Sequence, residues 1–68
     1  MEIDVGSSEG NIFYILGIFK KLKRQLEREG IDTSEYQKLL DNYSDMEYDE
    51  ILDKIEEITN GTIKFIGR

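Results

Sequence analysis

Gly6-Ser7-Ser8-Glu9-Gly10-Asn11 leads directly into Ile12-Phe13-Tyr14-Ile15-Leu16-Gly17-Ile18-Phe19, the most apolar stretch of this 68-residue chain. Small polar residues are typical of a helix start, because a serine hydroxyl accepts hydrogen bonds from the free N–H groups of the first turn. Glu9 is favourably placed in that turn. These segments predict a helix that begins at Ser7 or Ser8 and runs to about Glu29, where Gly30 can adopt the left-handed conformation that ends it.

The remaining elements follow from periodicity and from further start and stop signals. Alternation of apolar and charged residues predicts short strands at 1–5 and 62–66. Asp32 with Glu35 predicts the start of a second helix, and Ser44 with Glu47 the start of a third, which Asn60-Gly61 closes. The expected fold class is α+β, in the order β-α-α-α-β. Residues 1–68 form a single small domain, with three helices packed on a two-stranded sheet formed by the N- and C-terminal strands.

Composition excludes several kinds of site. The chain has no cysteine and no histidine, so it lacks disulfides and the thiolate and imidazole ligands of most metal sites. We therefore expect no metal and no cofactor. A net charge of −6 opposes direct binding to nucleic acid or to an anionic membrane. The apolar run is too short to span a bilayer, which favours a cytoplasmic protein. Because so short a chain buries a small core, we also expect a homo-oligomer, most simply a dimer.

Helical spacing divides the first predicted helix into two faces. The core stripe comprises Ile12, Ile15, Leu16, Phe19, Leu22 and Leu26. A glycine inside a helix costs about 1 kcal/mol relative to alanine, so the glycines opposite that stripe indicate close approach by another backbone. Either this back face contacts a second subunit or a target protein, or the strands or third helix cover Gly17 within one monomer. The residues of the candidate contact site are Gly10, Phe13, Tyr14, Gly17, Lys21 and Arg24.

Charged residues form two further candidate surfaces. The basic stripe is Lys20, Lys21, Lys23, Arg24 and Arg28, which either binds phosphate or complements the helix dipole and pairs with acids of the third helix. The acidic face is Asp45, Asp49, Glu50, Asp53, Glu56 and Glu57. Ordered carboxylates on a helix can occupy a basic groove of another protein; the alternative is a solvated helix surface. Their spacing does not match a calcium-binding loop.

The helix start offers a possible anion site. Ser7, Ser8, Gly10 and Asn11 lie where free backbone N–H groups can bind a phosphate. The segment lacks the lysine of a phosphate-binding loop, and Glu9 places a negative charge where the anion would sit, so the alternative is a helix cap. Without histidine or cysteine, and on a surface too small to enclose a water-excluded pocket, we do not expect an enzyme.

Two segments resemble small uncharacterised proteins of phages and bacterial mobile elements. The segment Ser7–Phe13, with Ile15-Leu16-Gly17, is similar to their S-P-E-G-N-A-F…I-M-G opening, and Ser44–Leu52 is similar to their S-G-D-Y-E-x-L-L segment. Ser8 stands where that opening has proline. The resemblance covers about a third of the chain. It implies a phage-like setting, and hence the cytoplasm of the host cell, and it transfers no functional residue.

These observations predict a non-enzymatic protein-binding module. In a phage-like setting it would be an accessory protein that binds and inhibits a bacterial host factor, such as a defence factor, by occlusion. Phe13, Tyr14 and Gly17 would supply close packing, while the acidic face would select a host protein with a basic surface. One alternative is a nucleotide-sequestering protein that uses the anion site or a dimer seam lined by Arg24 and Arg28. The other is a structural or assembly protein of a virion.

Overall fold

The predicted order of strands and helices is confirmed by the computed structural model, which describes residues 1–68. The elements are β1 (Glu2–Asp4), a 3-10 turn η1 (Ser8–Gly10), α1 (Ile12–Arg28), α2 (Ser34–Asn42), a second 3-10 turn η2 (Tyr43–Asp45), α3 (Tyr48–Ile58) and β2 (Lys64–Ile66). The chain is therefore an α+β domain in which the first and last segments form the sheet.

The two strands are parallel and pair Ile3 with Phe65 at the centre of the register. Both of these side chains are buried, and their strand neighbours on either side are exposed. Glu2 lies opposite Lys64, so opposite charges face each other across the register, although no ion pair forms between them. A parallel pair requires a long crossover connection. Here the three helices together provide it.

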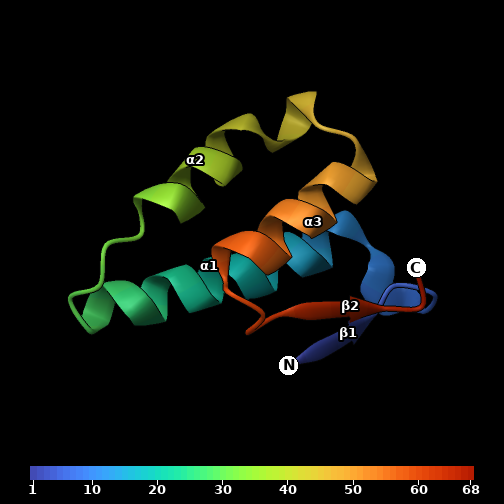
Figure 1. Ribbon diagram of the computed structural model, residues 1–68, viewed down its shortest axis with the longest axis horizontal. Helices are drawn as coiled ribbons and strands as arrows, with labels where there is room; N and C mark the ends of the chain where they lie inside the picture. The colour runs from blue at the N-terminus through green and yellow to red at the C-terminus, as the bar shows by residue number, and fades with distance from the viewer.

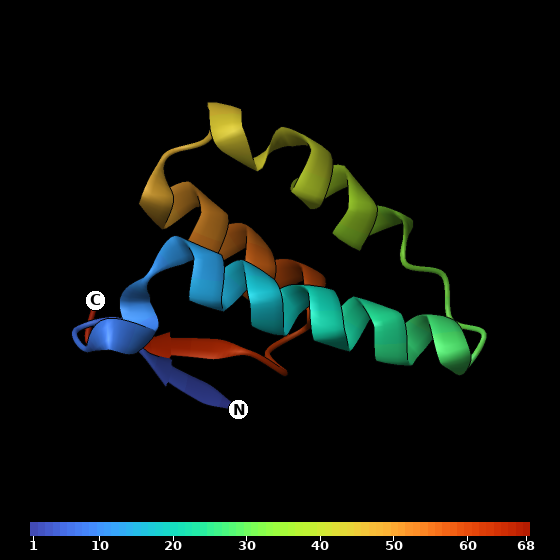
Figure 2. The same ribbon diagram turned by 180° about the vertical axis from the view of Figure 1, so that it is seen from behind.

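The helices and the sheet form layers, with α1 and α3 between α2 on one side and the sheet on the other (Figures 1 and 2). Apolar residues from every helix and both strands meet in one core, whose largest fully buried side chain is Phe19 of α1. Its ring stacks on Tyr36 of α2, with the ring centroids 4.8 Å apart. Burial raises the pKa of the Tyr36 phenol above its usual value. The stack fixes α2 across α1.

The helix α1 begins later than predicted. Ser7 caps only the short turn η1, where its hydroxyl accepts a hydrogen bond from the Glu9 N–H, at 3.1 Å. Asn11 then has an extended backbone, and its side chain accepts a hydrogen bond from the Phe13 N–H, at 2.8 Å. The predicted start at Ser7 or Ser8 is therefore wrong, because Asn11 is itself a strong N-cap residue and interrupts the helical path.

The predicted end of α1 is confirmed. Gly30 has a φ of 75°, which favours glycine. The Ile31 N–H donates to the Leu26 carbonyl and the Gly30 N–H to the Glu27 carbonyl, as in a glycine-terminated helix. At the start of α2 the Asp32 carboxylate accepts from the Ser34 N–H at 2.9 Å, although the cap position itself belongs to Thr33.

Glu27 connects the end of α1 to the start of α2 by hydrogen bonds. Its carboxylate accepts hydrogen bonds from Lys23, at 2.9 Å, and from the Thr33 hydroxyl, at 3.1 Å. The Lys23 bond, and then the Thr33 bond, lower the pKa of Glu27 below its ordinary value of 4.5. A carboxyl group with a lowered folded-state pKa stabilises the fold above the unfolded-state pKa, and this contribution disappears as the pH falls through the folded-state value.

Glu27→Gln should therefore lower the free energy of unfolding at neutral pH, and the difference from wild type should shrink as the pH falls below 4.5. Urea unfolding of both proteins at pH 7 and pH 3 measures it. Glu29→Gln is the matched control, because Glu29 is exposed and makes no ion pair. A difference that is the same at both pH values would show that the Glu27 carboxylate is not stabilised by its two partners.

The start of α3 differs from the predicted Ser44–Glu47 pair. Ser44 lies in η2, and the capping box is formed by Glu47 and Glu50, whose carboxylate accepts from the Glu47 N–H at 3.2 Å. The box is shifted by three residues because η2 continues the turn after α2. At the other end, Thr59 donates to the Ile55 carbonyl and Asn60-Gly61 close the helix as predicted, with φ values of 53° and 81°.

Candidate functional site

The outer face of α1 is left uncovered by the rest of the chain. Phe13 is 73% exposed and Tyr14 47% exposed, in a protein whose other aromatic rings are mostly buried or half-buried. A Cβ built on Gly17 would meet nothing within 4 Å. The interpretation that the strands or α3 cover Gly17 within one monomer is therefore wrong. In Figure 2, α1 lies in front of α3, and no other element covers its near side.

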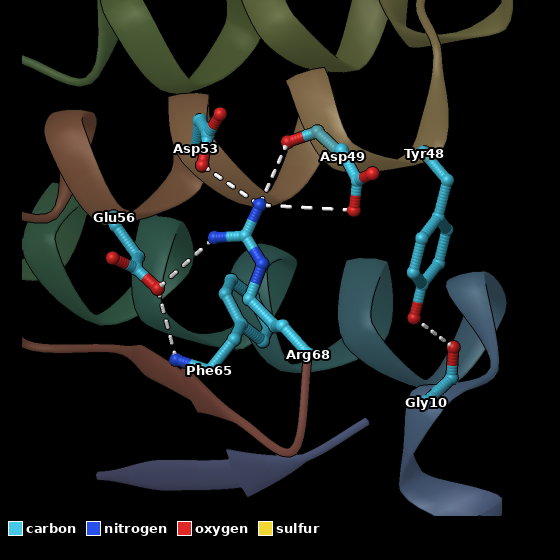
Figure 3. Close-up of polar contacts among 7 residues, drawn as sticks. All are labelled: Gly10, Tyr48, Asp49, Asp53, Glu56, Phe65 and Arg68. Atoms are coloured by element: carbon cyan, nitrogen blue, oxygen red, sulfur yellow. Dashed lines mark hydrogen bonds and ion pairs between the residues drawn. The ribbon is translucent and has the colours of Figure 1, made fainter. Parts of the chain in front are cut away.

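Gly10 does not belong to this outer face. It lies in η1, before α1, and a Cβ built on it would stand 2.9 Å from the Val5 carbonyl carbon. Its carbonyl oxygen accepts a hydrogen bond from the Tyr48 hydroxyl at the start of α3 (Figure 3). The expectation that Gly10 and Gly17 share one face is wrong, because the extended backbone at Asn11 breaks the helical spacing between them.

Basic residues occupy the second half of the same outer face. Lys20, Lys21, Arg24 and Arg28 lie in this half of α1, and a shallow hollow of about 270 Å³ is lined by Lys21, Arg24, Gln25 and Arg28. The predicted pairing of this stripe with acids of α3 is wrong. The only ion pair that the stripe makes is Lys23 with Glu27, within α1. The other four cations therefore remain available on a surface that begins with two aromatic rings.

The acidic face of α3 is occupied in part by the C-terminal residue of the chain. Arg68 donates to the Asp53 carboxylate at 2.8 Å, and its guanidinium also lies 3.7 Å from the Asp49 carboxylate and 3.8 Å from that of Glu56 (Figure 3). The hydrogen bond to Asp53, aided by all three negative charges, raises the pKa of Arg68 further. Glu56 also accepts from the Phe65 N–H at 3.0 Å, which connects α3 to β2.

Arg68→Ala should lower the free energy of unfolding by no more than about 1 kcal/mol, because the ion pairs lie at the surface. The loss should nearly vanish in about 1 M NaCl, where charges are screened over about 3 Å. Thermal unfolding at low and high salt measures both effects. Lys64→Ala is the control, because Lys64 is an exposed base of β2 that makes no ion pair. A loss that is independent of salt would contradict the electrostatic origin.

The other predicted acidic residues do not continue this cluster. Asp45 lies in η2 rather than on α3, so the predicted acidic face begins on that helix only at Asp49. Glu50 is used in the capping box, and Glu57 lies 3.7 Å from Lys54. No group of three or more acidic side chains is arranged to hold a metal ion. The acidic face therefore consists of Asp49, Asp53 and Glu56 around Arg68.

The predicted anion site has few free donors. The N–H groups of Gly6 and Glu9 donate to the side chains of Asp4 and Ser7, and those of Gly10 and Asn11 donate to the carbonyl groups of Ser7 and Ser8. The carboxylate of Glu9 also accepts from the Asp4 N–H. Two carboxylates thus line the segment that an anion would need to enter, and this arrangement favours a capping role for Ser7 and Asn11.

Sequence reasoning missed two of these contacts, those of Arg68 and Tyr48. Both residues join segments that are far apart along the chain, and only the position of β2 beside α3 brings Arg68 to the acidic face. A shallow groove of about 280 Å³ between α2 and α3, with Leu39, Met46 and Ile58 as its apolar residues and Lys38 and Lys54 beside them, was also not anticipated.

None of the helices combines the length and the apolar character that a membrane crossing requires. Compared with known protein families, with curated proteins and with solved structures, the chain matches none.

Proposed function

We propose that this protein is a non-enzymatic protein-binding module whose contact surface is the outer face of α1. The observation that carries the proposal is the exposure of Phe13, at 73%, next to an open glycine on the same face. Aromatic side chains supply large, rigid contact areas and are enriched at the centres of protein interfaces. A face that exposes two of them, in a chain with so small a core, gains stability when another protein covers it.

The acidic face is proposed as a second, selective element. Asp49, Asp53 and Glu56 together hold the Arg68 guanidinium, so this part of α3 has a geometry that suits an arginine side chain. A partner with a basic surface could compete with Arg68 for these carboxylates. Opposite charges increase the rate and selectivity of association more than the final affinity. The resemblance to phage proteins makes a bacterial host protein, inhibited by occlusion, the proposed target.

The experiment is a capture from bacterial lysate followed by titration. The immobilised chain is expected to retain one host protein stoichiometrically, and the purified host protein should bind the Phe13→Ala/Tyr14→Ala variant at least about tenfold more weakly. Ile31→Ala is the control, because Ile31 is a comparably exposed apolar residue outside α1. Equal affinity for all three proteins, or no retained host protein, would contradict inhibition of a host factor through this face.

Arg68 gives a separate test of the acidic face. If a basic partner displaces it, Arg68→Ala should strengthen binding, because the partner no longer competes with the chain's own guanidinium. Asp53→Asn should weaken binding, since Asp53 makes the shortest contact with the guanidinium. Isothermal titration against the retained protein compares the two variants. The acidic face would have no role in selection if both variants bound as wild type does.

A further inference from the structure

We propose that in the free protein a second copy of this chain covers the α1 outer face until a host protein displaces it, and that the two α1 helices pair antiparallel and cross at Gly17. The inference rests on the proposed function, because the second copy covers the same contact surface and the host protein competes with it for that surface. A two-fold symmetric interface uses the same patch on both subunits, so the patch must be complementary to itself. The residues of α1 meet this requirement in one orientation only.

The position of Gly17 favours a crossing of two helices at this residue. It lies at the middle of the exposed stripe, one helical turn after Phe13 and one turn before Lys21. No atom of its own chain explains a glycine there, since a Cβ would meet open space. The side chains at the contact set how closely two helices approach. A residue without a side chain at the crossing point therefore lets the backbones of two copies come together.

The order of the side chains along α1 makes the outer face complementary to itself. Phe13 and Tyr14 precede Gly17, and Lys20 and Lys21 follow it, at nearly equal distances along the helix. An antiparallel pair that crosses at Gly17 places the two aromatic rings of each copy opposite the two lysines of the other. The two-fold symmetry therefore forms this contact twice. A cation over the face of an aromatic ring is a favourable contact. The lysine stems also cover apolar ring surface while their ammonium groups stay in water.

The charges of α1 oppose the parallel orientation. In a parallel pair each lysine and each arginine of α1 would lie beside the same residue of the other copy. Like charges at close distance oppose association. In the antiparallel pair the basic halves point in opposite directions. Arg24 and Arg28 of one copy then extend toward the beginning of the partner's α1, which Glu9 in η1 precedes. Charge complementarity thus selects the antiparallel dimer.

The oligomeric state of the full chain gives the first test. Sedimentation equilibrium should give a mass of twice 8.0 kDa for the wild type. Phe13→Ala should raise the dissociation constant of the dimer at least about tenfold, because the contact is lost twice. Phe13 is exposed, so the variant should keep its fold, which circular dichroism checks. Ile31→Ala should leave the dissociation constant unchanged. A wild type of 8.0 kDa at millimolar concentration, or a dimer that Phe13→Ala does not weaken, overturns the proposal.

Single cysteines test the orientation, because the chain contains none of its own. In an equal mixture of the Tyr14→Cys and Lys21→Cys proteins under mild oxidation, the antiparallel pair should yield mainly the mixed disulfide, which intact mass spectrometry identifies. If each disulfide instead joins two copies of the same variant, the pair is parallel and the proposed geometry is overturned. A monomeric wild type that still binds a host protein through Phe13 would contradict the dimer but not the proposed function. A dimer that retains no host protein would contradict the proposed function but not the dimer.

Discussion

Phe19→Ala should lower the free energy of unfolding by about 3–5 kcal/mol, the usual cost of removing a buried aromatic ring. Phe19 is 0% exposed and stacks on Tyr36, so the substitution removes ring contacts to a second helix and leaves a cavity in the one core of the protein. A chain of this length is expected to have a total stability of only about 3–10 kcal/mol. The variant should therefore be largely unfolded, or close to it, at room temperature.

Phe13→Ala provides the matched control on the same helix. It removes the same side chain from an exposed position, where substitutions usually change stability by no more than about 0.5 kcal/mol. Urea unfolding followed by circular dichroism compares the two variants. The protein should be dilute, because dimer formation makes the apparent stability depend on concentration. Similar losses for both variants would mean that α1 does not bury the face that contains Phe19.

The second large effect is that alanine substitutions at two glycines should change the free energy of unfolding in opposite directions. Gly10→Ala should destabilise the fold by about 1–3 kcal/mol, because the added methyl group would collide with the backbone of Val5, which cannot move aside as a flexible side chain could. Gly17→Ala should stabilise the fold by about 0.5–1 kcal/mol, because alanine favours a helix and meets only solvent. Neither glycine has the left-handed backbone that would add strain.

Urea unfolding of the two alanine variants, again in dilute protein, measures both changes. Gly17→Ser is a useful companion, because serine also fits the open position but has a lower helix propensity than alanine, so its stabilisation should be smaller. A stabilising Gly10→Ala would show that η1 is free to move away from Val5. A destabilising Gly17→Ala in dilute protein would show that the outer face of α1 is covered within the monomer.

Local patterns predicted most of the fold because they depend on neighbouring residues. Period-two alternation located both strands, and the spacing of apolar residues located the three helices and the buried side of α1. Gly30 and Asn60-Gly61 marked helix ends correctly, since a left-handed residue is a local requirement. Two of the helix starts were predicted at the wrong residues. Ser7 and Ser44 are good capping residues, but Asn11 and the pair Glu47–Glu50 compete for the same role and occupy it.

The candidate surfaces were predicted correctly only where they depend on neighbouring residues. Phe13, Tyr14 and Gly17 were placed on one face of α1 by helical spacing alone, which holds wherever the helix is continuous. Gly10 was misplaced because the continuity ends at Asn11. The acidic residues of α3 were identified, but their shared partner Arg68 was not, because it follows β2 and approaches α3 only through the pairing of the two chain ends.

The sequence by itself determined which residues turn inward, where the first and third helices end, and that a long helix has an apolar patch on its far side. Those properties depend on side-chain chemistry and on a repeat of a few residues. Only the tertiary structure decided that the terminal strands run parallel, that Arg68 lies among three carboxylates, and that nothing in the chain covers Gly17. These depend on how distant segments pack around one shared core, and no local pattern encodes that arrangement.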